Sequence, residues 1–273
     1  MWRHPHLSGI EEQARIPLFQ TNPVEMGMTN QILNERLQAR DYYLEAFPAI
    51  FAEQKNPFSE ENVLAALASY QRSIITVNAP YDLFLQDDQD LSPASQRGLA
   101  LFKSEKLQCV SCHGGPFFNQ PTLPDGGLHE TAGFFNTGMY NVDGMGGYPS
   151  GAQGLYEITK EASDMGKYRT PSLRNVEKTG PWGHDGSFST LESVILSYAR
   201  GGRIVNSGAN AGDGSENPWK DPRLQGFSIT NDEISDLIAF LHDLTDEPAL
   251  QNPQYADPFC REKATDLPDC ITP

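Results

Sequence analysis

Apolar residues recur with helical spacing in several separate stretches of the chain, and capping residues precede them. Thr230 and Glu233 have the spacing of a capping box, and the apolar residues that follow lie at helical intervals. Ser92-Pro93 offers an N-cap followed by a proline at the first helical position, and Ser59 precedes a third periodic stretch. These patterns predict helices that begin after residues 59, 92 and 230.

A fourth periodic stretch ends at a tyrosine. Ser189 and Glu192 have the spacing of a capping box, and an apolar face runs from Leu191 to Tyr198. The pair Gly201-Gly202 follows as an expected helix stop, so Tyr198 is predicted to point inward from the last turn. On the pattern alone, a core tyrosine with its hydroxyl bonded to backbone is an alternative to a functional residue.

The composition narrows the class of protein. The 273 residues include 38% hydrophobic residues, 24 Gly and 20 Pro, which suits a globular protein with long loops, and residues 114–167 show little periodicity. No apolar run reaches the ~18 residues that a membrane span needs. The net charge of −16 disfavours nucleic acid and anionic membrane surfaces as partners and favours a partner with a basic face.

The most informative motif is Cys109-Val110-Ser111-Cys112-His113, which has the spacing of a covalent haem c attachment site. Both thiols can form thioethers with one porphyrin, and the adjacent imidazole of His113 can then reach the iron as its proximal ligand. A zinc half-site and a thioredoxin-like redox pair are the alternatives. Zinc would need a second Cys/His pair at suitable spacing and the redox motif a βαβ pattern, and the sequence shows neither, so we expect haem.

A haem iron with one histidine ligand has a sixth position, and the residue that fills it decides the chemistry. Several side chains downstream of the motif are candidates besides Tyr198 and other tyrosines. These are Met139, Met145, Met165, His129, His184 and His242.

Three short runs carry a family resemblance: residues 168–175 (YRTPSLRN), Gly180-Pro181, and residues 184–186 (HDG). They resemble the bacterial di-haem cytochrome c peroxidase and MauG superfamily, and residues 134–241 are most similar to its MbnH-type enzymes. There the position of Tyr198 holds methionine in ordinary peroxidases and tyrosine in the branch that includes MauG. The resemblance therefore implies that Tyr198 is the axial ligand opposite His113. A hard phenolate favours ferric and higher oxidation states, whereas a soft thioether favours ferrous iron.

The resemblance extends to the first residues of the chain. Trp2 matches the tryptophan that bridges the two haems, and Gln13, Pro17 and Glu25 match the distal pocket of the other haem, where peroxide binds. It implies that Gln13 hydrogen-bonds the bound oxygen species and that Glu25 moves protons. Two extra residues lie between Pro17 and Glu25 relative to ordinary peroxidases, so a charge at a helix N-terminus is an alternative role for Glu25.

The expected fold is mostly α: a cytochrome c-like haem domain with long loops, preceded by helices of a second, incomplete haem domain. Residues 1–88 would be the C-terminal remainder of a first, peroxidatic haem domain, residues 89–247 the cytochrome c-like domain with one covalent haem, and residues 248–273 a tail. We expect a disulfide between Cys260 and Cys270 in that tail. No signal peptide is visible in the sequence. We therefore expect the signal peptide and the second haem site upstream of Met1, and we expect any calcium site to need that upstream sequence.

The resemblance implies a periplasmic oxidoreductase that uses hydrogen peroxide to oxidise a partner protein through high-valent haem, this chain carrying the His/Tyr-ligated haem. The alternatives are a cytochrome c peroxidase that removes hydrogen peroxide with electrons from a donor protein, and a mono-haem electron-transfer cytochrome c. At the haem edge, His184, Arg169 and Arg174 are candidates to contact propionates. Four phenylalanines are candidates to shield the porphyrin: Phe117, Phe118, Phe134 and Phe135.

Overall fold

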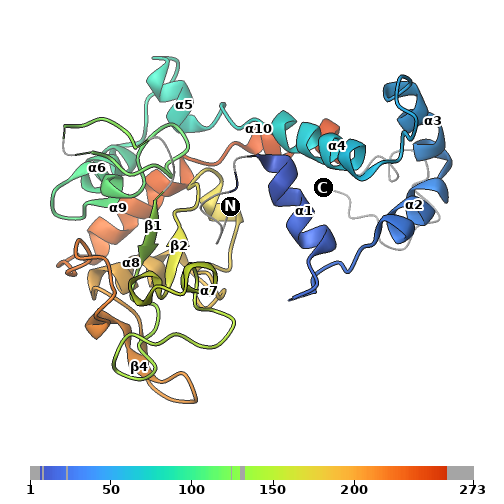
Figure 1. Ribbon diagram of the computed structural model, residues 1–273. Helices are drawn as coiled ribbons and strands as arrows, with labels where there is room; N and C mark the ends of the chain where they lie inside the picture. Colours follow the sequence, from blue (N-terminus) through green and yellow to red (C-terminus); the bar gives the residue numbers. More distant parts are fainter. Residues whose placement is uncertain (1–6, 8, 23, 124, 130–132, 257–273) are drawn as a thin grey trace. The chain divides into compact units, whose positions relative to one another are not determined.

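The structure, a computed structural model, describes residues 7, 9–22, 24–123, 125–129 and 133–256 of the chain. The chain divides into two compact units, the first ending at Ile75 and the second beginning at Thr76 (Figure 1). Trp2, Cys260 and Cys270 lie outside the described residues. None of the helices among the described residues is long and apolar enough to cross a membrane.

The first unit is formed by helices packed around two small apolar clusters. Ser59 starts the longest of these helices, as predicted, because its hydroxyl accepts a hydrogen bond from the Asn62 amide at 3.3 Å. This helix packs against the first one through Leu64, Ala14 and Leu18. The helices are α1 (Ile10–Phe19), α2 (Asn30–Gln38), α3 (Asp41–Ile50) and α4 (Glu60–Ser73).

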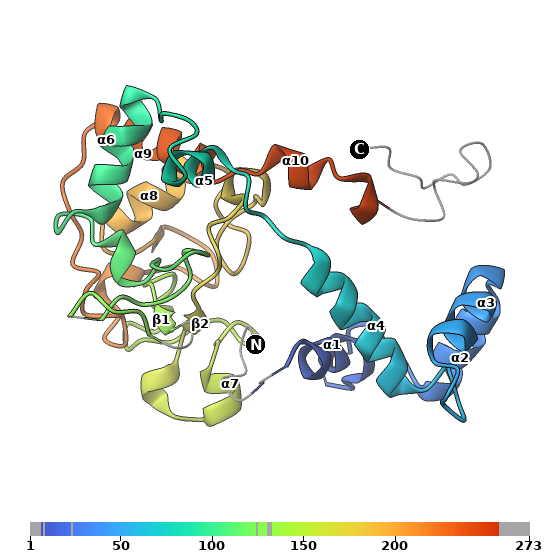
Figure 2. The same cartoon turned by 90° about the horizontal axis from the view of Figure 1, so that it is seen from above.

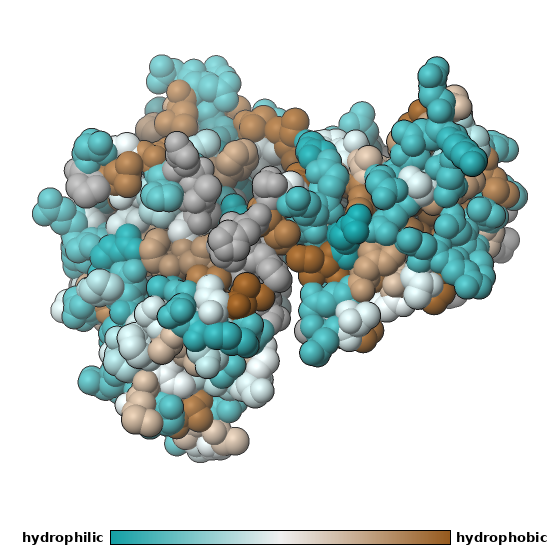
Figure 3. Space-filling model, in the orientation of Figure 1, coloured by the Kyte–Doolittle hydropathy of each residue, from teal (hydrophilic) through white to brown (hydrophobic). Residues whose placement is uncertain are grey.

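The surface of the first unit is mainly hydrophilic, with apolar side chains among the polar ones on the face that Figure 3 shows. Leu67, Tyr70 and Ile74 are exposed along α4 by 39%, 48% and 45%. Their spacing places them along one side of the helix.

The second unit is a helical core with long loops, and α6 and α9 lie side by side in it (Figures 1 and 2). Gly98 makes their contact possible, because a Cβ there would collide with the backbone carbonyl of Asp236. Phe102, Phe240 and Phe118 pack together beneath the crossing, with ring centroids 5.2 to 6.2 Å apart. Its helices are α5 (Pro80–Leu85), α6 (Pro93–Lys103), α7 (Tyr156–Thr159), α8 (Leu191–Ala199), α9 (Asn231–His242) and α10 (Glu247–Leu250).

Two short strand pairs fasten the loops of the second unit. β1 (Phe134–Asn136) pairs antiparallel with β2 (Lys167–Arg169), with Phe135 opposite Tyr168. β3 (Ile204–Val205) pairs in the same way with β4 (Gly212–Asp213). The stretch 114–167 is mainly loop, as expected, although it contains β1 and α7. The observed elements confirm a mostly α fold with long loops.

The caps of α6 and α9 are confirmed, whereas that of α8 was predicted one residue too early. The hydroxyl of Ser92 accepts from the Ser95 amide, and Thr230 and Glu233 form the predicted capping box. In α8 the N-cap is Thr190, which accepts from the Ser193 amide at 3.1 Å. Phe188 pairs with Trp182 through two backbone hydrogen bonds, and this pairing keeps the chain extended past residue 188 and delays the helix.

Residues 76–88 pack with the second unit, whereas the predicted boundary groups them with residues 1–75. Tyr81 on α5 belongs to the core of the second unit, and its ring contacts Phe240 at a centroid distance of 5.6 Å. The amide of Tyr81 also donates to the carbonyl of Asp243 at 3.0 Å. The apolar face of α5 therefore fixes it to the unit that carries the CxxCH motif.

Candidate functional site

The CxxCH motif folds into a tight turn directly after α6. Gln108 takes a left-handed backbone conformation with φ of 54°, and a short 3-10 helix covers Cys109–Ser111. The amides of Cys112 and His113 both donate to the carbonyl of Cys109, at 3.2 and 2.8 Å. The turn thus presents two thiols and an imidazole from five consecutive residues, and the two thiols are not joined to each other.

His113 is in the protonation state that a metal ligand requires. Its Nδ1 lies 2.9 Å from the carbonyl oxygen of Phe118, and since a carbonyl only accepts, Nδ1 carries the hydrogen. Nε2 is then left with a lone pair. Burial lowers the pKa of His113, and the Phe118 and Pro171 carbonyls oppose this effect, so the net shift favours the neutral ring.

Tyr198 faces the cysteine pair from the last turn of α8. Gly201, with φ of 77°, follows the helix as predicted. Burial raises the pKa of the Tyr198 phenol, and the proximity of the thiols of Cys112 and Cys109 raises it further. Within the described part of the chain no hydrogen bond to the Tyr198 hydroxyl is present, so the expectation of a backbone-bonded core tyrosine does not apply there.

The two thiols are buried in different surroundings. Burial raises the pKa of Cys109 to about 12 and also raises the pKa of Cys112. Cys109 and Val110 pack against the main core of the second unit, whereas Cys112 also has the charged Arg223 and Asp221 and the hydroxyl of Ser111 nearby. A site that combines two unlinked thiols, an imidazole and a phenol without a hydrogen bond to any described residue is chemically suited to covalent haem.

The other candidate ligands lie in different surroundings. Met139 is buried with Tyr140 and Tyr148 in a separate cluster, and Met165 packs against it. His184 stacks on Tyr168, with ring centroids 4.0 Å apart. Met145 is 73% exposed, and His129 and His242 belong to a loop and to the end of α9.

Sequence reasoning did not identify a clamp on the motif turn. Arg223 donates from one guanidinium nitrogen to the carbonyl of Ser111 at 3.0 Å and binds Asp221 through two others, at 2.8 and 2.9 Å. Its guanidinium carbon also lies 4.4 Å from the ring centroid of Phe135. Thr122 donates to the carbonyl of Val110 at 2.7 Å. The contact of Arg223 spans 112 residues and has no local sequence signature.

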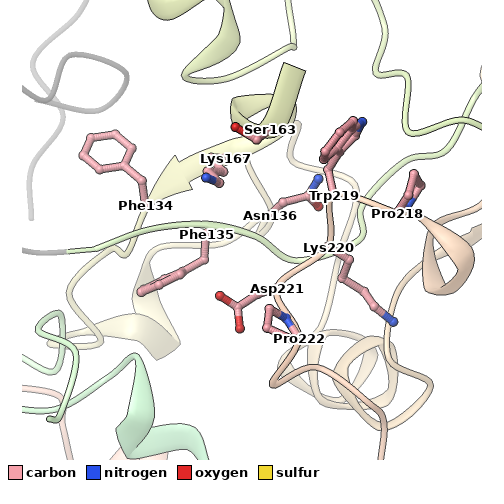
Figure 4. A pocket seen from close by; sticks show the side chains of 10 residues that line it. All are labelled: Phe134, Phe135, Asn136, Ser163, Lys167, Pro218, Trp219, Lys220, Asp221 and Pro222. Carbon is pink, nitrogen blue, oxygen red and sulfur yellow. The ribbon is translucent and has the colours of Figure 1, made fainter. Parts of the chain in front are cut away.

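A hollow of about 360 Å³ adjoins this clamp, between β1 and the segment 218–222. Figure 4 shows Phe135 and Asp221 on one side of it and Trp219 on the other. The amine of Lys220 is bound by the carbonyls of Gly201 and Ser215, and that of Lys167 by Asp164. The polar groups around the hollow are therefore largely engaged with the protein itself.

Arg174, which was expected to face a haem propionate, is engaged within the protein. One of its nitrogens lies 2.6 Å from Oδ2 of Asp82, and the other two donate to the carbonyl of Pro116 at 2.9 and 2.8 Å. The side chains of Arg174 and Asp82 are only 8% and 10% exposed. The structure thus shows Arg174 in an ion pair within the protein, and its contact with a haem propionate stays a prediction.

The predicted distal residues belong to the first unit, whereas the motif turn and Tyr198 belong to the second. Gln13 is half-buried on α1, and Pro17 lies one turn further along the same helix. The amide of Met26 donates to the carbonyl of Pro17 at 3.0 Å, which brings the segment containing the exposed Glu25 beside Pro17. The structure therefore brings these three residues into one region, while Trp2 lies outside the described residues.

A mostly α unit that places a tyrosine beside a CxxCH turn has the features of a c-type cytochrome. Comparison with known proteins identifies the family more specifically. A family model described as di-haem cytochrome c peroxidase matches residues 1–90. The crystal structure of a MauG-like protein associated with microbial copper homeostasis shares 38% identity over 95% of this chain and 75% of that one, with a TM-score of 0.87. The chain belongs to the di-haem cytochrome c peroxidase and MauG family, as its sequence motifs predict.

Curated relatives from both branches of the family match most of the chain. The cytochrome-c peroxidase IdrP1 of Pseudomonas sp. (strain SCT) is 32% identical over 90% of this chain, and the methylamine utilization protein MauG of Methylorubrum extorquens is 32% identical over 88%. The cytochrome c551 peroxidase of Pseudomonas aeruginosa is 28% identical over 89%. The chain spans 65%, 59% and 60% of the length of these three relatives.

Proposed function

We propose that this chain carries one haem c of a peroxide-dependent di-haem oxidoreductase, attached through Cys109 and Cys112 and ligated by His113 and Tyr198. The observation that carries the proposal is the placement of Tyr198. Its phenol lies close enough to the thiols of Cys112 and Cys109 for them to raise its pKa, and no described residue forms a hydrogen bond with its hydroxyl. A phenol beside the two attachment cysteines is the side chain best placed to complete the ligand set with His113.

Each residue of the site has a distinct task in this proposal. The thiols fix the macrocycle, and the Nδ1–H bond to Phe118 orients His113 and increases its basicity. Tyr198 binds as phenolate, so its hydroxyl must lose a proton. Burial and the nearby thiols oppose this loss, because both raise the pKa of the phenol. The bound haem supplies one-electron redox chemistry, and the hard phenolate oxygen stabilises its oxidised forms.

Gln13 and Glu25 would act at the other haem of the family, where hydrogen peroxide binds. Gln13 would donate a hydrogen bond to the bound oxygen species, and Glu25 would hold and move its proton. The hydrogen bond from Met26 to Pro17 supports a common location for these side chains in the first unit. Trp2 would connect the two haems electronically, and the family resemblance adds a calcium ion between the haems to the proposal.

The partner would be a protein in the periplasm. The net charge of −16 favours a partner with a basic surface, either an oxidised substrate or an electron donor. The similarity to a MauG-like protein associated with copper homeostasis favours a substrate from copper handling. The relatives that are cytochrome c peroxidases support the second candidate function, removal of hydrogen peroxide with electrons from a small cytochrome.

The ligand assignment is tested with the Tyr198→Met variant of the haem-loaded protein. We expect wild-type ferric protein to lack the near-infrared band of His/Met-ligated haem and the variant to show it, with a higher midpoint potential, because thioether sulfur stabilises ferrous iron. Tyr156→Phe, a change at a tyrosine on α7 in the same unit, is the control and should leave spectrum and potential unchanged. A His/Met band in the wild type, or an unchanged potential in Tyr198→Met, would contradict the assignment.

The two candidate functions differ in which protein hydrogen peroxide oxidises. A MauG-like enzyme oxidises a partner protein without any added reduced cytochrome, and the oxidised side chain is identified by mass spectrometry of the partner. A cytochrome c peroxidase consumes reduced cytochrome in proportion to peroxide and leaves the partner protein unmodified.

A further inference from the structure

Three consecutive backbone carbonyls next to the motif turn each accept a side-chain hydrogen bond. Pro116 accepts from Arg174 at 2.9 and 2.8 Å, Phe117 from the hydroxyl of Ser172 at 2.7 Å, and Phe118 from Nδ1 of His113 at 2.9 Å. We call residues 116–118 the carbonyl ladder. The last carbonyl of the ladder holds the imidazole of the proposed proximal ligand, and the first two are held by the segment 172–174.

The ladder is anchored by a buried ion pair. Arg174 and Asp82 approach to 2.6 Å, and their side chains are only 8% and 10% exposed. The Arg174 guanidinium also lies 5.5 Å from the ring centroid of Phe118. Asp82 is itself fixed at the start of α5, where its carboxylate accepts from the Ala79 amide at 3.0 Å. The ion pair therefore ties α5 and the segment 172–174 to the ladder.

The conformation of Phe118 depends on this support. Its φ of 54° is in the left-handed region, which is unfavourable for a bulky residue. Its ring is 6% exposed and packs between Tyr81 and Phe102. The contacts around Phe118 hold its backbone in this conformation. If those contacts are lost, the carbonyl no longer keeps its direction.

We propose that Arg174, through its buried ion pair with Asp82, is a positioning residue that sets the hydrogen bond of His113 and thereby the electron donation of this ligand to the haem iron. A strong Nδ1–H···O bond increases the basicity of the imidazole and stabilises ferric iron. Loosening the ladder weakens that bond and favours ferrous iron. The inference rests on the proposed ligation of haem by His113.

The test exploits the opposite charges of the two partners. Asp82→Asn and Arg174→Gln both loosen the ladder, so positioning predicts that both raise the midpoint potential of the haem. A purely electrostatic influence predicts opposite shifts, because removal of a negative charge favours ferrous iron and removal of a positive charge favours ferric iron. We expect the ferrous-to-ferric ratio at a fixed potential to rise about three- to tenfold in both variants.

Two further variants separate charge from geometry and keep the proposal testable if the ion-pair variants do not fold. Arg174→Lys retains the charge but not the planar fork, and it should also raise the potential. Ser172→Ala, at an exposed serine, removes the bond to Phe117 and the bond that the hydroxyl accepts from the Arg174 amide, keeps the ion pair, and should raise the potential to a smaller extent. Arg97→Gln is the control, since this arginine pairs with Asp236 on α9, its side chain is 62% exposed, and it makes no contact with the ladder.

The direct readout is the exchange of the His113 Nδ1 proton with D2O, followed by NMR in the haem-loaded full chain. We expect faster exchange in the Asp82, Arg174 and Ser172 variants and wild-type exchange in Arg97→Gln. Opposite potential shifts in Asp82→Asn and Arg174→Gln, or wild-type exchange in folded Arg174→Lys, would overturn the inference. Failure of the proposed function would instead be seen as retention of the wild-type haem spectrum by a His113→Gly variant.

Discussion

At the scale of single residues, the turn that carries the two cysteines is held by side-chain hydrogen bonds. Thr122 donates to the carbonyl of Val110 and Arg223 to that of Ser111, and His113 donates from the turn to the carbonyl of Phe118. The first two bonds satisfy carbonyls of the turn, and the third fixes the imidazole. The orientation of the thiols and of the imidazole therefore depends on side chains that make no bond to haem themselves.

The Arg223 clamp leads to a prediction about stability. Arg223→Gln removes the bond to Ser111 and leaves Asp221, whose side chain is 13% exposed, without its cation. We expect a loss of about 1–3 kcal/mol in the free energy of unfolding, because the remaining polar groups lose their partners. Urea unfolding followed by circular dichroism measures this loss, and the amount of covalent haem per chain should fall with it.

Arg97→Gln is the matched control for that experiment, because the carboxylates of Asp236 and Asp221 are exposed to a similar extent, 12% and 13%, whereas Arg97 forms no hydrogen bond with the described residues of the motif turn. If the two variants lost the same stability and bound the same haem, the clamp would have no special role.

Asp185 leads to a prediction about pH. Burial raises its pKa, but hydrogen bonds from Tyr140, Ser187 and Arg203 outweigh this and lower the pKa to about 2. Because the folded value lies below the unfolded one of about 3.9, the stabilisation is present above about pH 4 and is lost as the pH falls through about 2.

We expect Asp185→Asn to lower the free energy of unfolding by about 1 kcal/mol at pH 7 and to flatten its decline between about pH 4 and pH 2. Urea titrations at several pH values measure this, with Asp88→Asn at an exposed position after the end of α5 as the control. A steep decline that persists in Asp185→Asn would show that other carboxylates dominate the acid response.

At the scale of elements, the second unit is organised around the contact between α6 and α9. Gly98 lets the two backbones approach, and Phe102 and Phe240 fill the space beneath. The motif turn follows α6 after a short connection, so the position of α6 against α9 also determines where the two cysteines lie. Haem attachment and helix packing are thus coupled by chain continuity.

A substitution at the crossing should therefore affect both. In Gly98→Ala the new methyl group meets the Asp236 carbonyl and the Cβ of Phe240, and neither can move without a shift of the whole helix. We expect a loss of about 1–3 kcal/mol in the free energy of unfolding. Thermal and urea unfolding measure it.

Gly127→Ala serves as the comparison, because its Cβ would approach mainly the flexible carboxylate of Asp125. Its effect should be a few tenths of a kcal/mol (about 0.5 at most). Equal destabilisation by both substitutions would show that the helix crossing is not the constraint.

At the scale of the whole molecule, the local features of the sequence were the predictable ones. The caps of α6 and α9 and the glycine stop after Tyr198 each lie within a few residues, and these predictions agree with the structure. The CxxCH spacing is equally local, and haem attachment there stays a prediction. Family motifs predicted the family itself, which the comparisons confirm.

The interactions that the sequence did not predict are those between distant positions. Arg174 and Asp82 are 92 residues apart and Arg223 and Ser111 are 112 apart, so no spacing rule connects them. The start of α8 was missed because Ser189 and Thr190 are both good caps, and the pairing of Phe188 with Trp182 decides between them. The grouping of α5 with the second unit likewise follows from packing of Tyr81 rather than from composition.

The long reach of these contacts has a consequence for how the protein matures. Arg174 contacts Pro116 across 58 residues, and Arg223 contacts Ser111 across 112, so both arginines are synthesised well after the cysteines. Until these later segments have folded, the carbonyls of Ser111 and Pro116 lack their arginine partners. The geometry of the cysteine turn is therefore completed only when the C-terminal half of the chain folds onto it.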